Sequence, residues 1–473
     1  MTHRIEDVVA RGMCVGCGAC AVRTADAIPV TIGRYGVFQA RLEGVDAEAI
    51  RDASRVCPFS DESVNEDALT QERFAGMPTD DKLGAHLEIL AGRRTSEDEV
   101  VLSSSGGLTS FVLAELLSSG TVDAVIHVGR ATGEQHFDYA ISTTVDELES
   151  SRKSMYTATT FAEVVTAIRG DGLSYAVVGL PCFITALRHL AREMPELGTQ
   201  IAVYVGLVCG HLKSTFFAES LAWQGGIAPA DLESIDFRVK QPGRPASDYD
   251  YAAVSRRDHA SRVRRTRDAF DTPWGYGAFQ PEACNFCDDV FAESADVAFA
   301  DAWLPQYQDD WRGTNVVVVR DERVQALLRA AAERGEIELA PLSAEDAARS
   351  QAGNFRHRRT GLAVRLADDL KRGLSVPIKR VDPDRTLVTR RRAAVIRQRR
   401  RMSRLSLERF ARARAADDFE VYAAPMRRAI GRYDLLDAAA RGPKPLLRFL
   451  KRRVSALLTR TRRQRRKPTA TGG

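Results

Sequence analysis

The sequence predicts an α/β fold with a largely parallel sheet at its core, and three observations lead to this prediction. Short apolar runs alternate with helical patterns from about residue 83 onward, as in chains built from βαβ units. A cysteine- and glycine-rich segment precedes this region, and a strongly basic segment follows it. We therefore expect an N-terminal segment over 1–80, an α/β domain over 81–375 and a helical basic extension over 376–473. A chain of 473 residues, 44% of them hydrophobic, is not disordered throughout.

The apolar periodicity gives the order of the core elements. The expected helices are Leu108–Leu117, Phe161–Arg169, Phe183–Arg192, Thr215–Trp223 and Val324–Arg334. The expected strands are Ala124–Val128, Tyr175–Leu180, Ile201–Val208, Ile235–Lys240 and Asn315–Arg320. Between the last two strands, the Pro- and Gly-rich stretch 241–250 and the charged segment 256–267 predict a mobile or inserted loop.

Eight cysteines fall into two sets of four, and the first set has the more specific spacing. Cys14, Cys17 and Cys20 form a C-x-x-C-x-x-C motif, and Cys57 is followed by proline. Bacterial ferredoxins hold 4Fe-4S clusters with closely spaced cysteines and a Cys-Pro. A structural zinc site, the main alternative, prefers two separated C-x-x-C pairs. The spacing predicts a small ferredoxin-like iron-sulfur segment, in which the glycines between the cysteines would let the backbone approach bound sulfide.

The second set, Cys182, Cys209, Cys284 and Cys287, is predicted to hold another 4Fe-4S cluster. Cys182 and Cys209 each follow an expected strand. Because the carboxyl ends of parallel strands border the binding crevice of an open sheet, both thiols should project into it. The C-x-x-C pair at 284 and 287 would complete the site from a loop. Ordinary buried cysteines and a zinc site at this pair are the alternatives.

The N-terminus is charged, and no stretch has the roughly 20 uninterrupted apolar residues that a membrane span needs. These features predict an unexported, cytoplasmic protein without transmembrane helices. Because cytosolic thiols stay reduced, we expect the cysteines to bind metal rather than to pair as disulfides.

A glycine-serine turn precedes the expected helix that begins at Leu108. Small residues would let the backbone approach a ligand there, and free N–H groups at a helix N-terminus attract phosphate. An N-cap in a flexible turn is the plain alternative. The candidate cofactor-binding residues are Ser105, Gly106, Gly107 and Thr109 in the turn, with Lys153 and Tyr156 from another segment.

Together these motifs resemble the beta subunits of coenzyme F-420 hydrogenase and dehydrogenase, a family that includes 7-hydroxymethyl chlorophyll a reductase and a divinyl-chlorophyllide reductase. The resemblance covers residues 10 to about 370. It is carried by MCVGCGACA at 13–21, CP at 57–58, SSSGGLTS at 103–110, VVGLPCFITALRHL at 177–190, LVCGH at 207–211, CNFCDD at 284–289, ADVAFADAW at 295–303 and GTNVVVVR at 313–320.

The resemblance implies an iron-sulfur flavoprotein oxidoreductase. It would pass electrons between two 4Fe-4S clusters, FAD and an organic acceptor or donor, with coenzyme F-420 as a candidate substrate. The glycine-serine turn would hold the flavin, and each set of four cysteines would hold a cluster. We expect electrons to pass from the first cluster through the second to FAD, or in the reverse direction. His189 and His211 are weak candidates for proton transfer, and an ordinary core or surface histidine is the alternative for each.

Two further features bear on the site. Ala300 stands before Asp301, where the family usually has glycine, and an added methyl group would crowd a close backbone approach, so Asp301 is assigned no role. The basic segment Asn354–Arg359 would either contact an anionic substrate or be a solvated stretch, which is the commoner case.

The C-terminal extension is strongly basic, with 27 basic and 6 acidic residues from Arg385 onward. Leucine and valine residues between 446 and 458 fall largely on one helical face among these charges, as in interfacial membrane helices. We therefore expect peripheral contact with an anionic membrane at its inner face. Binding of nucleic-acid backbone is the rival, no specific nucleic acid is expected, and a solvated tail is the plain alternative.

Three functional classes compete. The first is an oxidoreductase with its own chemistry on a small-molecule or lipid-linked substrate, supplied by ferredoxin or another redox protein. The second is an electron-transfer subunit that serves a partner enzyme and has no end-substrate chemistry. The third is a zinc-stabilised binding protein, which the iron-sulfur spacing disfavours.

Overall fold

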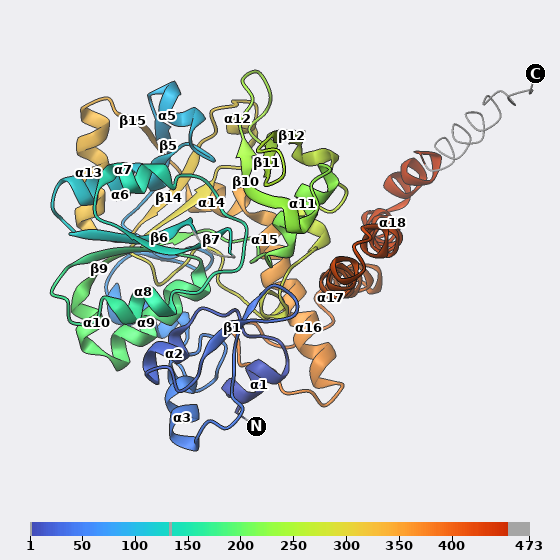
Figure 1. Cartoon of the computed structure of the whole chain (residues 1–473), viewed down its shortest axis with the longest axis horizontal. Coiled ribbons are helices and arrows are strands. Elements are labelled where there is room, and N and C mark those ends of the chain that lie inside the picture. The colour runs from blue at the N-terminus through green and yellow to red at the C-terminus, as the bar shows by residue number, and fades with distance from the viewer. Residues whose placement is uncertain (1, 132–134, 453–473) are drawn as a thin grey trace, which may run out of the picture.

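The computed structural model describes residues 2–131 and 135–452, and its centre is an eight-stranded sheet (Figure 1). The strand order is β15-β5-β14-β13-β9-β8-β6-β7. Strands β13, β9, β8 and β6 run parallel, and the flanking pairs are antiparallel. The α/β class and the parallel centre are therefore confirmed. The strands are β5 Glu88–Arg94, β6 Ala124–Arg130, β7 Phe137–Ser142, β8 Tyr175–Gly179, β9 Ile201–Leu207, β13 Val297–Asp301, β14 Asn315–Val319 and β15 Ile337–Pro341.

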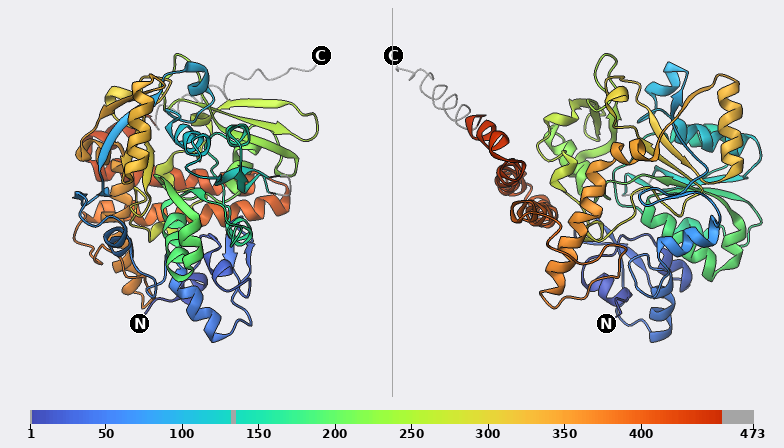
Figure 2. Two further views of the ribbon diagram at one scale, coloured as in Figure 1. Left: turned by 90° about the vertical axis from the view of Figure 1, so that its left-hand side faces the viewer. Right: turned by 180° about the vertical axis from the view of Figure 1, so that it is seen from behind.

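Helices cover both faces of the sheet, because successive residues of a strand point to opposite faces. In β8, Tyr175 and Val177 join the apolar cluster under α8 and α9, whereas Ala176 and Val178 join the cluster under α6 and α13. Figures 1 and 2 show the resulting three layers. The covering helices are α5 Glu97–Val101, α6 Leu108–Ser118, α7 Val145–Ser150, α8 Ala162–Ala167, α9 Pro181–Glu193, α10 Pro195–Gln200 and α13 Glu322–Glu333.

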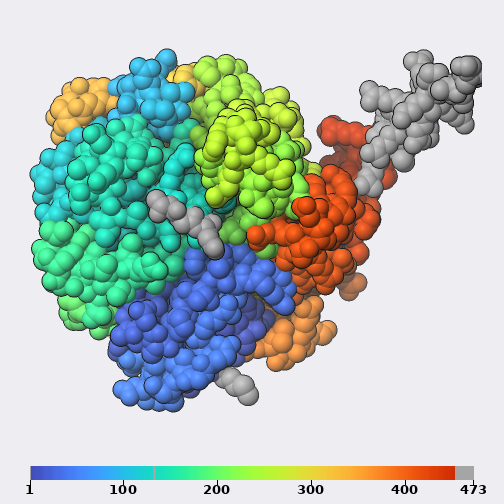
Figure 3. Space-filling model, in the orientation of Figure 1, coloured from blue at the N-terminus to red at the C-terminus, as the bar shows by residue number. Residues whose placement is uncertain are grey.

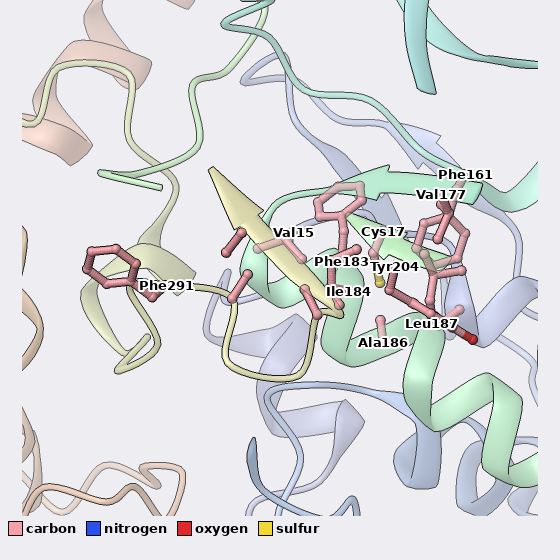
Figure 4. Close-up of a cluster of buried hydrophobic side chains, with 14 of the residues drawn as sticks. Val15, Cys17, Phe161, Val177, Phe183, Ile184, Ala186, Leu187, Tyr204 and Phe291 are labelled. Carbon is pink, nitrogen blue, oxygen red and sulfur yellow. The ribbon is translucent and has the colours of Figure 1, made fainter. Parts of the chain in front are cut away.

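The N-terminal segment consists of short elements that pack beside α8 and α9. Its two-stranded hairpin β1-β2 and helices α2 and α3 enclose a small apolar cluster around Ile28 and Ala53. Cys17 lies in the larger core with Phe183 and Ile184 of α9, so the segment is joined to the body through shared packing (Figure 4). The elements are α1 Ile5–Ala10, α2 Ala19–Arg23, β1 Val30–Ile32, β2 Phe38–Ala40, α3 Ala47–Val56, α4 Glu66–Arg73, β3 Thr79–Asp80 and β4 Gly84–Ala85.

A second sheet replaces much of the loop expected between residues 241 and 267. Strands β10 Leu232–Val239, β11 Asp250–Ser255 and β12 Ser261–Arg265 form a three-stranded antiparallel sheet beside helix α11 Phe216–Gln224. The loop prediction was therefore wrong for 261–265 and for Asp250, and the strand at 251–255 between the two predicted stretches was missed. Residues of β11 alternate between buried and half-buried positions, whereas β12 is an exposed edge strand rich in arginine. Charged side chains on an edge strand give a sequence the composition of a loop.

The C-terminal extension is helical, as predicted, but its first helix belongs to the body. Helix α17 Arg390–Ala416 and helix α18 Glu420–Arg441 pack against each other. Met402, Phe410 and Ala413 of α17 are buried in one apolar cluster with α11 and β10, and Figure 3 shows this contact from outside. The apolar face expected over 446–458 extends beyond residue 452, outside the described residues. The helices before α17 are α14 Ala344–Ser350, α15 Ala352–Arg358 and α16 Thr360–Leu370.

Within residues 2–131 and 135–452, no helix is both long enough and apolar enough to cross a membrane.

Replacing Phe410 with alanine should reduce the free energy of unfolding by about 3–5 kcal/mol, because the large ring would leave a cavity in the core. The ring is fully buried, and its centroid lies 5.1 Å from that of Phe216 and 5.2 Å from that of Tyr422. Chemical denaturation of Phe410→Ala and of the exposed control Arg412→Ala would measure the loss. Equal small losses in both variants would contradict the docking of α17.

Glu219 should make stability depend on pH. Its carboxylate on α11 lies 3.0 Å from Arg414 Nε of α17. Burial raises the pKa of Glu219 to about 7, although Arg414 opposes this shift. Because the folded state holds the proton more tightly than the unfolded chain, stability is lost as pH rises from about 4.5 to 7 and is constant above. Glu219→Gln should therefore be more stable than wild type at pH 8, by about 3 kcal/mol, and equal to it near pH 4.

Denaturant titrations at several pH values would measure this difference, with the exposed Glu408→Gln on α17 as the control. A stability difference that does not change with pH would contradict a raised pKa at Glu219.

Candidate cofactor site

The first four cysteines converge where α2, α3 and β2 meet. Cys14 and Cys17 lie in the loop before α2, Cys20 lies in α2, and Cys57 ends α3. Burial, followed by the nearby Cys14, Cys17 and Cys57 sulfurs, raises the pKa of the Cys20 thiol well above its usual value. The structure thus brings together all four cysteines of the first group.

Backbone N–H groups surround these thiols. The Ala40 amide donates to Cys14 Sγ at 3.4 Å. Hydrogen bonds from the backbone amides of Ala19 and Phe59 act to lower the pKa of Cys17 and Cys57, respectively. Such donors favour the thiolate, which is the form of cysteine that binds metal.

The two glycines between the cysteines are required by protein contacts. Gly16 has φ +71°, and a Cβ atom there would lie 2.2 Å from Phe38 Cβ. Gly18 has φ +102°, and its Cβ would lie 2.6 Å from Thr160 Oγ1. The sequence suggested approach to bound sulfide as the reason for these glycines. The described contacts give a different reason for these glycines: the cysteine loop packs closely against β2 and the start of α8.

The second four cysteines converge at the carboxyl ends of β8 and β9, which are parallel neighbours. Cys182 lies in the first turn of α9, directly after β8, and Cys209 follows β9. Cys284 lies in the short 3-10 turn η4 Glu282–Asn285, and Cys287 follows it. Burial, then the Cys287, Cys209 and Cys284 sulfurs, raises the pKa of Cys182.

The two thiol groups are neighbours. Cys17 of the first group is among the residues whose charge raises the pKa of Cys182, after burial and the other thiols of the second group. Tyr139 lies close to both groups. Burial, followed by the nearby Cys182 and Cys17 sulfurs, raises the pKa of its hydroxyl. That hydroxyl donates to the Val178 carbonyl at 3.1 Å.

Each thiol group offers four sulfur ligands. In the described ranges, no three His, Cys, Asp or Glu side chains are placed to hold one metal ion. A zinc ion gathers all its sulfur and nitrogen ligands at about 2.0–2.3 Å, whereas a cubane binds each thiolate through a different iron atom. Four buried or half-buried cysteines with N–H donors at some of their sulfurs form a donor set that suits an iron-sulfur cluster.

Arg358 of α15 lies against the second thiol group. Its guanidinium is 1% exposed, donates from Nη1 to Cys287 Sγ at 2.9 Å and donates from Nη2 to the Cys209 carbonyl at 2.7 Å. Burial alone would lower the pKa of Arg358, but the Cys287, Cys209 and Cys284 sulfurs raise it above its ordinary value. The sequence did not assign Arg358 this position, although its spacing from Phe355 and Leu362 places it on an apolar helical face.

The rest of segment 354–359 is divided among several environments. Asn354 lines the cavity described next, and Arg356 is exposed. His357 Nε2 lies 3.1 Å from the Cys284 carbonyl oxygen. The segment therefore contacts the second thiol group through Arg358, whereas Arg356 is exposed and Arg359 is half-exposed, as expected of a solvated basic stretch.

A cavity of about 630 Å³ opens beside the second thiol group, and this volume is typical of cofactor sites, which span roughly 300–1,000 Å³. Cys209 forms part of its wall. Of the predicted site residues, the wall also contains Ser105, Gly107, Thr109, Lys153, Tyr156 and His211.

Two predicted residues lie off the wall. Gly106 is buried behind it, where a Cβ atom would lie 2.7 Å from the Gly92 carbonyl oxygen. His189 lies in the core, with Nε2 2.9 Å from the Val64 carbonyl oxygen, and burial lowers its pKa to about 4.

The polar end of the cavity contains the N-terminus of α6. The N-cap Gly107 has φ +82° and no capping side chain of its own. The Leu108 amide donates to Asn315 Oδ1 at 3.2 Å, which leaves the next amides of the first turn to face a ligand. Lys240, which the sequence did not single out, donates to the Ser105 carbonyl at 2.6 Å and to the Arg312 carbonyl at 2.6 Å. Lys240 therefore holds the glycine-serine turn in place. Unsatisfied N–H groups at a helix N-terminus attract phosphate.

Asp301 has a clear structural role here. Its Oδ2 accepts from Arg238 Nη1 at 2.9 Å, and both side chains line the cavity. Ala300 lies in β13 and also lines the cavity, so its methyl group is accommodated. Lys153 forms an ion pair with Asp236 at 2.9 Å, which places a second cation at this end.

Another part of the cavity wall is aromatic. The ring of Trp274 lies 5.3 Å from that of Tyr156 and 4.4 Å from that of His211. His211 Nε2 is buried and has no protein partner. Lys213 Nζ lies 4.9 Å from the Trp274 ring, and burial lowers the pKa of Lys213 to about 7. Aromatic walls and an unpaired ring nitrogen suit a flat, polar-edged ligand such as a flavin ring.

Comparison with protein families identifies the chain. The family described as coenzyme F-420 hydrogenase/dehydrogenase, beta subunit, matches through its N-terminal part at residues 89–166 and its C-terminal part at 172–345, together more than half of the chain. The chain belongs to this family. The second thiol group and most of the cavity wall lie within the matched ranges, whereas the first thiol group, Arg358 and α17 lie outside them.

Two curated relatives are similar to the chain. One subunit of the F(420)H(2) dehydrogenase of Methanosarcina mazei is 26% identical over 220 residues, covering 44% of this chain and 56% of that protein. The beta subunit of the coenzyme F-420 hydrogenase of Methanothermobacter thermautotrophicus is 23% identical over 271 residues, covering 55% of this chain and 86% of that protein. The chain thus spans little more than half of the first relative's length. Membership of the family supports an oxidoreductase role.

A chain of the F-420-reducing [NiFe] hydrogenase complex from Methanosarcina barkeri, solved after xenon derivatization, is also similar. The TM-score is 0.48 at 16% identity, covering 64% of this chain and 99% of that chain.

Gly16→Ala should destabilise the protein far more than Gly44→Ala. Both glycines have positive φ, at +71° and +77°, so each alanine pays a backbone cost of about 1 kcal/mol or more. Only the Gly16 variant adds a clash, because nothing lies within 4 Å of a Cβ at Gly44. Thermal unfolding of the two variants would compare them. Equal losses would show that the cysteine loop is not packed on Phe38 as described.

Proposed function

We propose that this chain is an iron-sulfur flavoprotein that passes electrons between two 4Fe-4S clusters, FAD and an organic acceptor or donor. One observation carries the proposal, namely that Cys209 belongs both to a group of four neighbouring thiols and to the wall of a cofactor-sized cavity. A cluster on this group would lie next to whatever occupies the cavity. When bound, FAD would exchange electrons in pairs with an organic substrate and one at a time with a cluster.

The chain's own residues divide the work of binding. Ser105, Gly107 and Thr109 at the N-terminus of α6 would bind the pyrophosphate of FAD, with Lys153 and Arg238 near that end. Tyr156 and Trp274 would pack against flat parts of the cofactor. Gly106 would act indirectly, by letting the turn approach β5 closely.

The cysteines would hold the clusters in an order along one path. Cys14, Cys17, Cys20 and Cys57 would hold the first, and Cys182, Cys209, Cys284 and Cys287 the second. The proximity of Cys17 to Cys182 supports direct exchange between them. His211, in the cavity wall with a free Nε2, is a better candidate for proton exchange than the core residue His189.

The named relatives suggest a substrate and a setting. Both are subunits, one of a dehydrogenase of reduced coenzyme F-420 and the other of a coenzyme F-420 hydrogenase. Coenzyme F-420 is therefore the first organic partner to test, followed by a lipid-linked substrate, with ferredoxin as a one-electron partner. The same two names favour a second candidate function, electron transfer on behalf of a partner enzyme.

A cytoplasmic location with peripheral contact to an anionic membrane remains part of the proposal. It is supported by exposed arginines at 401, 412, 428 and 432 on α17 and α18 and by the exposed Leu447 and Leu450 beyond α18.

Anaerobically purified protein should contain about eight iron, about eight acid-labile sulfide and one FAD per chain, as two four-iron clusters require. Cys182→Ser should lose about four iron and one EPR signal of the reduced protein, while Cys20→Ser should lose the other signal. Flavin should remain bound in Cys20→Ser, because no cysteine of the first group lines the cavity. Zinc without flavin, or an unchanged iron content in Cys182→Ser, would overturn the proposal.

A further inference from the structure

The two thiol groups differ in the charge that surrounds them. At the second group, the Arg358 guanidinium donates directly to Cys287 Sγ at 2.9 Å from a position that is 1% exposed. At the first group, in the part of the chain that the structure describes, no side chain donates a hydrogen bond to a sulfur, and the donors are backbone amides such as that of Ala40. The cation that acts on this group is the half-buried Arg41, whose charge lowers the pKa of Cys14.

Carboxylates near the second group offset this difference only in part. The buried Asp289 lies close enough to act on Cys209, Cys287 and Arg358, but no oxygen of it lies within 4 Å of the Arg358 guanidinium. Asp288 follows Cys287, but its carboxylate lies 3.6 Å from Lys379 Nζ and 3.5 Å from Arg380 Nε, so two cations offset it. Arg365 is 2% exposed, donates to the Asn285 carbonyl between Cys284 and Cys287, and has no carboxylate within 4 Å among the described residues. Arg358 likewise lacks such a carboxylate there. Both arginines therefore add positive charge beside the second group.

We propose that Arg358 is a positioning residue that raises the reduction potential of the second cluster above that of the first. This inference rests on the proposed function, because it needs a cluster at each group. A fixed positive charge and a charge-assisted hydrogen bond to a ligand sulfur stabilise the reduced cluster, which carries one more negative charge than the oxidised cluster. In a low-dielectric interior this stabilisation is strong.

A higher reduction potential at the second cluster favours electron flow from the first cluster to the second. With a reduced iron-sulfur protein as the one-electron donor, the second thiol group would hold the better electron acceptor of the two clusters, and this group lies beside the cavity that would hold the flavin. No proton moves in the step between clusters, since Arg358 stays protonated. The second cluster, beside the cavity, thus collects electrons from the first.

The test is an EPR-monitored redox titration of three proteins: wild type, Arg358→Gln and Arg358→Lys. Cys20→Ser identifies which signal belongs to the first cluster. In the wild type, the second cluster should have the higher midpoint potential. In Arg358→Gln, the equilibrium constant for electron transfer from the first to the second cluster should fall about tenfold or more, which for a one-electron couple is about 59 mV. In Arg358→Lys, which keeps the charge, this equilibrium constant should fall less.

Arg356→Gln is the matched control, because it removes the same charge from an exposed position on the same helix. It should leave both potentials unchanged. If Arg358→Gln fails to assemble the second cluster, the wild-type order decides, and a second cluster at or below the potential of the first overturns the proposal. Full iron content with unchanged potentials in Arg358→Gln also overturns it. Absence of iron from the wild-type protein would instead refute the proposed function.

Discussion

Buried positive charge around the second thiol group is the constraint on which the C-terminal half of the structure depends. Arg358 and Arg365 are almost completely buried, and the described residues place no carboxylate within 4 Å of either. A buried charge without a counter-charge is costly. The thiols do not supply one while they are protonated, because burial raises the pKa of Cys284 to about 12 and that of Cys287 to about 11. Negative charge arises at these sulfurs when metal displaces their protons.

Arginines also link the second thiol group to helices α16 and α17. Arg365 of α16 donates to the Asn285 and His357 carbonyls, and Arg399 of α17 contacts the His357 ring. The helices outside the matched family ranges are therefore linked to the Cys284–Cys287 loop by arginines. Helix α17, whose composition suggests a solvated tail, is fixed to the body by this set of contacts and by the apolar packing of Phe410.

The sheet explains why the site forms where it does. Because β8 and β9 are parallel neighbours, their carboxyl ends bring Cys182 and Cys209 together, and the same edge receives the turn before α6. Periodicity and cysteine spacing predicted from sequence that Cys182 and Cys209 meet at this edge, whereas the position of the glycine-serine turn beside Cys209 comes from the structure. They did not predict the β11-β12 hairpin, because arginines on an edge strand resemble a loop. Nor did they predict Arg358, Arg365 or Lys240, because basic residues are assigned to solvent unless tertiary contacts show otherwise.

Hydrogen-deuterium exchange of the protein with and without the clusters proposed at its thiol groups would test the central claim most directly. If the cluster's negative charge compensates the buried arginines, removal of iron and sulfide should increase exchange in α15, α16 and the first half of α17. Exchange in the sheet strands β13 and β14 should change little, because their packing is apolar. Equal protection of α15–α17 in the two forms would show that these helices do not depend on charge at the second thiol group, and would contradict the account.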